Sequence, residues 1–79
     1  MKFGQWIYLE LDSLGRSVNW LAKNVGKSHS AFIDYRNTDR KVTADVLMES
    51  IKVLAKERGC SEERLLLRIA RECYSVGVE

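Results

Sequence analysis

Glycine and serine residues divide this chain into short segments of helical periodicity, and this division strongly constrains the fold. Each of Gly15, Gly26 and Gly59 can end a helix, because glycine adopts the left-handed backbone that closes a helix C-terminus. A serine, a favoured cap for the start of a new helix, follows each glycine two positions later, at Ser17, Ser28 and Ser61. The chain has no proline that would interrupt the segments in between. The pattern predicts an all-α protein.

Apolar residues recur at helical spacing in each segment, which predicts five helices and no strand. In the first segment, Phe3, Ile7, Leu11 and Leu14 share one helical face, with Trp6 and Leu9 beside it. The next three helices are predicted to bury Val18, Leu21, Ala22 and Val25; then Ala31, Phe32 and Tyr35; then Leu47, Ile51, Leu54 and Ala55. Thr43 is expected to cap the fourth helix, and the fifth is expected over 61–75, with Ser61 as its cap.

The length and composition indicate one small domain over residues 1–79. A domain of this size buries only about 60–65% of its unfolded surface, so a partner would add stability. No apolar run approaches the ~20 residues of a membrane span, and the first residues do not form a secretory signal. We therefore expect a cytoplasmic protein with no membrane partner. Cys60 and Cys73 are then expected to be free thiols, a disulfide between them being the alternative.

The sequence contains no arrangement typical of an enzyme. It has one histidine, His29, and no glycine-rich phosphate loop or Cys-x-x-Cys motif. His29, Cys60 and Cys73 are spaced like no standard zinc site. We therefore expect no catalytic activity, no metal and no cofactor.

The fifth segment carries more apolar residues than one core readily accepts. Leu65, Leu66 and Leu67 are consecutive, so they point about 100° apart around a helix. Leu65, Ile69 and Cys73 form one stripe, which Leu66 and Ala70 extend, while Leu67 and Tyr74 lie elsewhere. The surplus apolar surface predicts a dimer contact formed by Leu66, Leu67 and Tyr74. The alternative is a wide buried face closing over the first helix.

The segment 17–37 reads as two short helices joined at Gly26. Ala22 is small enough for two helices to cross closely, and Gly26 accepts the backbone of the turn. Phe32 and Tyr35 would bury the inner face of the second helix. From Leu21 to Tyr35 the chain resembles the helix-turn-helix of the phage Cro/C1-type repressor family. The likeness continues through the polar loop 37–41 and the two later helices, and it departs from the family pattern at Val18 and Arg58, where glutamine and leucine are frequent.

This resemblance implies a five-helix, lambda-repressor-like domain that binds double-stranded DNA as a homodimer. It implies a phage- or prophage-type transcriptional repressor whose second motif helix enters the major groove by its N-terminal end. The base contacts expected there are Ser28, His29, Ser30, Ile33 and Asn37. The expected phosphate contacts are Ser17, Lys27, Arg36, Arg40 and Lys41.

A second function class stays open. The net charge is only +2, which does not by itself imply nucleic acid. The basic residues gather around the two-helix segment, whereas many of the glutamates lie in the second half of the chain. An antitoxin or adaptor that keeps the same fold would use the fifth helix, through Leu67 and Tyr74, to bind a protein partner.

Overall fold

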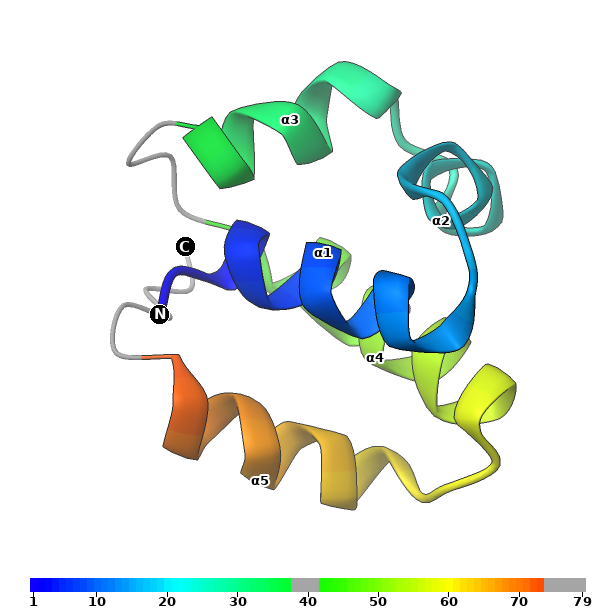
Figure 1. Ribbon diagram of the computed structural model, residues 1–79, viewed down its shortest axis with the longest axis vertical. Coiled ribbons are helices and arrows are strands. Elements are labelled where there is room, and N and C mark those ends of the chain that lie inside the picture. Colours follow the sequence, from blue (N-terminus) through cyan, green and yellow to red (C-terminus); the bar gives the residue numbers. More distant parts are fainter. Residues whose placement is uncertain (38–41, 74–79) are drawn as a thin grey trace.

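The computed structural model describes residues 1–37 and 42–73, and this described part is all α-helical (Figure 1). Its helices are α1 (Phe3–Leu14), α2 (Val18–Val25), α3 (His29–Asn37), α4 (Ala44–Arg58) and α5 (Glu62–Glu72). The prediction of five helices is confirmed, and the described residues contain no strand. No helix in the described part is both long enough and apolar enough to cross a membrane.

The predicted glycine breaks have the expected backbone. Gly15, Gly26 and Gly59 have φ values of 68°, 75° and 77°, and each directly follows the last residue of a helix. The Ser17 and Ser61 hydroxyl oxygens accept hydrogen bonds from backbone amides in the first turns of α2 and α5. These bonds satisfy amides that the helix itself leaves unpaired.

The prediction for Thr43 is only half right. Thr43 precedes α4 in an extended conformation, as an N-cap does, but its side chain makes no capping bond. The hydroxyl instead donates to the Asp45 carboxylate, 2.6 Å away. The Thr43 hydroxyl is therefore hydrogen-bonded to Asp45, two residues later, and α4 begins without a side-chain cap.

Helix α1 lies at the centre of the molecule, between α3 and α5 (Figure 1). Helices α3 and α5 are on opposite sides of it, and α4 closes the back of the core by packing on α2 and α5. Helix α2 is seen end-on in this view while α3 lies in its plane, so the two cross steeply. This arrangement leaves one side of α3 that none of the described helices covers.

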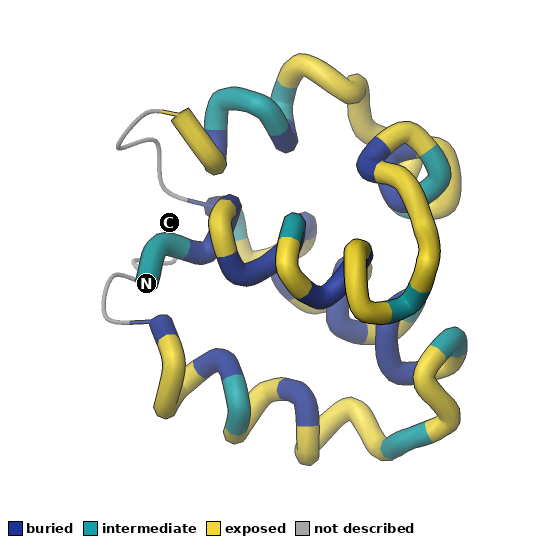
Figure 2. The backbone as a smooth tube through the Cα atoms, viewed as in Figure 1, coloured by how far each residue is buried: buried dark blue, intermediate teal, exposed yellow. Residues whose placement is uncertain are grey.

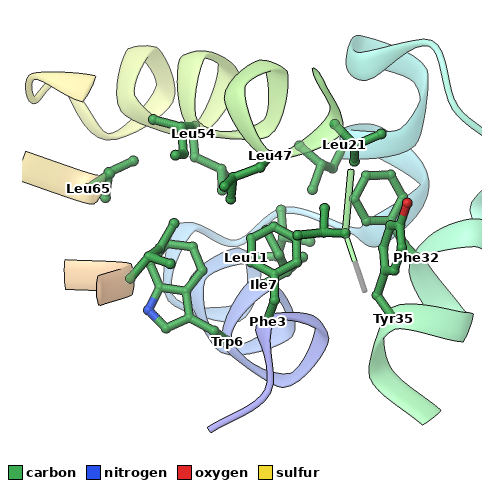
Figure 3. Close-up of a cluster of buried hydrophobic side chains, with 14 of the residues drawn as sticks. Phe3, Trp6, Ile7, Leu11, Leu21, Phe32, Tyr35, Leu47, Leu54 and Leu65 are labelled. Carbon is green, nitrogen blue, oxygen red and sulfur yellow. The ribbon is translucent and has the colours of Figure 1, made fainter. Parts of the chain in front are cut away.

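One cluster of buried side chains joins all five helices (Figures 2 and 3). Trp6, Ile7 and Leu11 of α1 meet Leu54 of α4 and Leu65 of α5, each at most 2% exposed. The predicted core is confirmed apart from its margins: Leu14, Val25 and Ala31 are only partly buried, and Leu9 is 58% exposed.

Gly4 sets the spacing between α1 and α3. A Cβ placed on it would lie 2.2 Å from the backbone atoms N of Arg36 and C and O of Tyr35. The two helix backbones can approach this closely only because Gly4 has no side chain.

Helix α5 differs from its prediction in two ways. The helix ends at Glu72 and not near Ser75, because Cys73 already has an extended backbone (φ −104°, ψ 112°). Leu65, Ile69 and Cys73 form the buried stripe as predicted. Leu66 and Ala70 do not extend it: both are exposed, and Leu66 is 41% and Leu67 60% accessible. Tyr74 lies outside the described residues, and both cysteines are free.

Candidate nucleic-acid interface

Helices α2 and α3 are joined by a three-residue connection at the surface. Val18, Leu21 and Ala22 are the buried residues of α2. Gly26 then turns the chain, and its amide and that of Lys27 both donate to the Ala22 carbonyl, at 2.9 and 3.0 Å. The Ser28 hydroxyl accepts from the amide of Ala31 at 3.3 Å, as its predicted capping role requires. The connection is thus held at both ends by hydrogen bonds.

Helix α3 is fixed by two aromatic side chains on its inner face. Phe32 and Tyr35 are 1% and 4% exposed, and their rings meet edge to face with centroids 5.7 Å apart. The Tyr35 ring also meets Phe3 of α1 edge to face, at 6.3 Å. This packing leaves α3 a free outer side, and helical spacing places Ser30, Ile33 and Asn37 along it.

The residues predicted to contact bases share this surface. Ser28, His29, Ser30 and Asn37 are exposed, and Ile33 is partly buried. Ser28, His29 and Ser30 lie together at the N-terminal end of α3, where unpaired backbone amides give the helix a partial positive charge. The structure therefore brings together hydrogen-bonding groups and one apolar side chain on a face that no described helix covers.

Three of the residues predicted to contact phosphate, Ser17, Lys27 and Arg36, already have partners within the protein. The Ser17 hydroxyl caps α2. The Lys27 ammonium lies 3.8 Å from the Asp45 carboxylate, and the Arg36 guanidinium lies over the Tyr8 ring, 4.3 Å from its centroid. All three are exposed, so these contacts position the side chains without burying them. Arg40 and Lys41 lie outside the described residues.

Asp45 restrains Lys27 electrostatically. The Thr43 hydroxyl, the amide of Val46 and the Lys27 ammonium all lower the pKa of the Asp45 carboxyl, the hydroxyl most strongly. Asp45 is therefore ionised at neutral pH. A DNA phosphate that contacts Lys27 would have to compete with this carboxylate.

Positive charge is concentrated in the α2–α3 segment. Residues 17–37 hold three basic side chains and one acidic one, whereas residues 42–73 hold six of each. The later helices are therefore neutral as a group, although their glutamates suggested an acidic half. A net positive charge in the α2–α3 segment is favourable for binding a polyanion.

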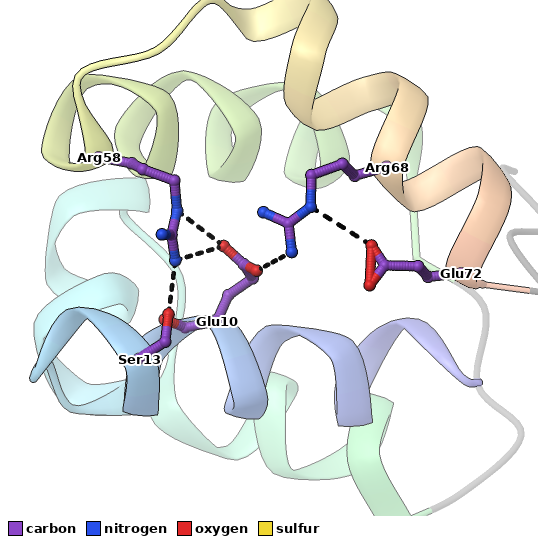
Figure 4. Close-up of polar contacts among 5 residues, drawn as sticks. All are labelled: Glu10, Ser13, Arg58, Arg68 and Glu72. Carbon is purple, nitrogen blue, oxygen red and sulfur yellow. Dashed lines mark hydrogen bonds and ion pairs between the residues drawn. The ribbon is translucent and has the colours of Figure 1, made fainter.

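A polar network that sequence reasoning missed joins α1, α4 and α5 (Figure 4). Glu10 is 5% exposed and its carboxylate lies between two guanidinium groups. Nη2 of Arg58 is 2.9 Å from Oε2, and Nη2 of Arg68 is 2.5 Å from Oε1. Arg58 also donates to the Ser13 hydroxyl, and Arg68 to Glu72.

This network gives Arg58 a structural role, because its guanidinium pairs with the buried Glu10 carboxylate. The hydrogen bond to Glu10 is the main cause that raises the pKa of Arg68 above its ordinary value. A signal was present in the sequence, because Glu10 stands three residues after Ile7 and next to Leu11, on the buried side of α1. A carboxylate at such a position requires cationic partners.

The described residues contain no group of three or more histidine, cysteine, aspartate or glutamate side chains that could hold a metal ion. Comparison with protein-family models, with curated proteins and with solved structures returned no significant match. The functional interpretation therefore depends on the geometry and chemistry of this chain alone.

Proposed function

We propose that the protein is a sequence-specific DNA-binding regulator of the phage- or prophage-repressor type. The observation that carries this proposal is the position of α3. It is held from behind by Phe32 and Tyr35, crosses α2 steeply through the Gly26 turn, and turns an uncovered polar face outward. Inserting α3 into a major groove would place Ser28, His29 and Ser30 at the base edges, with Ile33 against a thymine methyl.

The proposed regulator acts as a homodimer. Leu66 and Leu67 are large apolar side chains exposed on α5, and α5 lies on the side of α1 opposite α3. Pairing through these leucines would remove apolar surface from water and carry two α3 helices. Recognition helices about 34 Å apart would reach successive major grooves of a two-fold operator.

The readout residues can be tested once an operator has been selected from a random DNA pool. We expect His29→Ala and Ser30→Ala to cost about 1–3 kcal/mol in specific binding and little in folding, because both side chains are exposed. Arg71→Ala is the control, since Arg71 is an exposed residue of α5, and α5 lies on the side of α1 opposite α3. Gel-shift titration that gives unchanged specific affinity for both variants would remove these two residues from the readout.

The dimer has its own matched test. Leu67 and Leu9 are 60% and 58% exposed, on α5 and α1 respectively. Leu67→Glu should give a monomer in analytical ultracentrifugation, whereas Leu9→Glu should remain dimeric. A wild-type protein that is monomeric at high concentration, or a Leu9→Glu variant that dissociates equally, would contradict the proposed interface.

The same exposed leucines favour a second candidate, an antitoxin or adaptor that binds a different protein through α5. The two functions differ in their response to salt. DNA binding that weakens steeply as salt rises supports the regulator, because binding releases counterions from phosphates. An absence of DNA binding at low salt, together with a stable complex with another protein, supports the adaptor.

A further inference from the structure

The turn between α4 and α5 holds a hollow with an unusual number of arginines. Its volume is about 290 Å³, and it is lined by Arg58, Gly59, Cys60, Arg64, Leu65 and Arg68. In Figure 1 this turn lies well away from α3. The hollow is therefore separate from the candidate DNA surface.

Positive side chains predominate in the lining of the hollow. Arg58, Arg64 and Arg68 line it and no acidic residue does, although Glu62 and Glu63 stand in the adjacent first turn of α5. Glu10 pairs with both Arg58 and Arg68, and Glu72 pairs with Arg68, whereas within the described residues the Arg64 guanidinium has no hydrogen-bond or ion-pair partner. The Arg64 guanidinium thus brings a full positive charge to the wall of the hollow.

The backbone adds donors to the same corner. Gly59 has no side chain, and a Cβ built on it would have no atom within 4 Å, so the rim of the hollow is open there. Helix α5 starts directly after this rim, and the Ser61 hydroxyl oxygen accepts a hydrogen bond from the amide of Arg64. The amides of Glu62 and Glu63 precede it in this first turn, at the positive end of the helix dipole, and the two carboxylates offset part of that charge.

We propose that this hollow binds a phosphate group, with Arg64 as its principal ligand. Arginine offers two parallel N–H donors, which suit the paired oxygens of a phosphate. Glu10 shows that Arg58 and Arg68 already hold an oxyanion from one side, and a phosphate would approach from the side of Arg64. The phosphate could come from a free anion or from the backbone of a polynucleotide.

Titration with inorganic phosphate tests the site on the whole chain. Amide NMR signals of Gly59 and Cys60 should shift and saturate in phosphate, and should not do so in chloride of equal ionic strength. Arg64→Ala should weaken this binding about tenfold, the factor for one lost charge-assisted contact. Arg71→Ala is the matched control, because Arg71 is also an exposed arginine of α5 but does not line the hollow.

A second titration with a short duplex of random sequence distinguishes the two sources of phosphate. Saturable shifts with inorganic phosphate point to a free anion. Shifts at Gly59 and Cys60 with the duplex alone point to a nucleic-acid backbone, and Arg64→Ala must weaken either one. Shifts that chloride reproduces, or that Arg64→Ala leaves intact, would overturn the proposal. Both outcomes are separate from the test of α3, which uses His29 and Ser30.

Discussion

Gly4→Ala should destabilise the protein, although alanine normally favours a helix. In an open helix the change would add about 1 kcal/mol to the free energy of unfolding. Here the new Cβ would lie 2.2 Å from backbone atoms of Tyr35 and Arg36, whereas ordinary contacts begin near 3.4 Å. Helices α1 and α3 would have to separate by more than an ångström, since backbone atoms cannot rotate away.

The magnitude follows from these two opposing effects. Overpacking typically costs about 1–3 kcal/mol, and contact with rigid backbone places this case at or above the upper end. After subtraction of the helical gain, we expect a net loss of about 2 kcal/mol. For a domain of this length, that loss corresponds to a melting temperature lower by about 8–16 °C.

Urea unfolding followed by circular dichroism measures this change. Gly15→Ala is an informative comparison, because its Cβ would meet nothing within 4 Å and only its φ of 68° is unfavourable. It should cost about 1–2 kcal/mol from backbone strain alone. A Gly4→Ala variant as stable as the wild type would refute the close approach of α1 and α3.

Two further predictions concern buried polar groups. Glu10→Gln should lower the free energy of unfolding in urea by about 2 kcal/mol. This is less than the roughly 3–5 kcal/mol of a fully buried pair, because the Arg58 and Arg68 side chains are 32% and 37% exposed. Glu57→Gln, whose partner Arg16 lies at the surface, should cost under about 1 kcal/mol, and equal losses for the two variants would contradict this difference. Burial raises the pKa of the Cys73 thiol from 9.0 to about 11. The unfolded chain therefore loses this proton at a lower pH than the folded protein does, and the free energy of unfolding should fall as pH rises from 9 to about 11. Cys73→Ala should not show this part of the decline, and identical pH profiles would exclude it.

The helices were predictable because local signals determine them. Gly15, Gly26 and Gly59 end helices through their own backbone preference, and Ser17 and Ser61 cap through bonds to amides three residues away. These features need no knowledge of distant parts of the chain. The placement of His29 and Ser30 on an exposed surface is predictable for the same reason, since it follows from the spacing of Phe32 and Tyr35.

Features that depend on distant partners were missed. Glu10 is paired with residues 48 and 58 positions away, and no local pattern identifies those partners. Gly4 resembles an ordinary weak point in a helix until the backbone of α3 is placed against it. The predicted buried face of α5 is too wide for a similar reason. It includes Leu66 and Ala70, which the neighbouring helices leave exposed.

The central position of α1 has a consequence for the order in which the chain can fold during synthesis. Arg68, which lies over the Trp6 ring and pairs with Glu10, is made 58 positions after Glu10. A nascent chain that has reached Gly59 still lacks Leu65 and Ile69, which complete the core. The side of α1 that carries Trp6 therefore stays uncovered until α5 has left the ribosome, and it is a surface available to a chaperone.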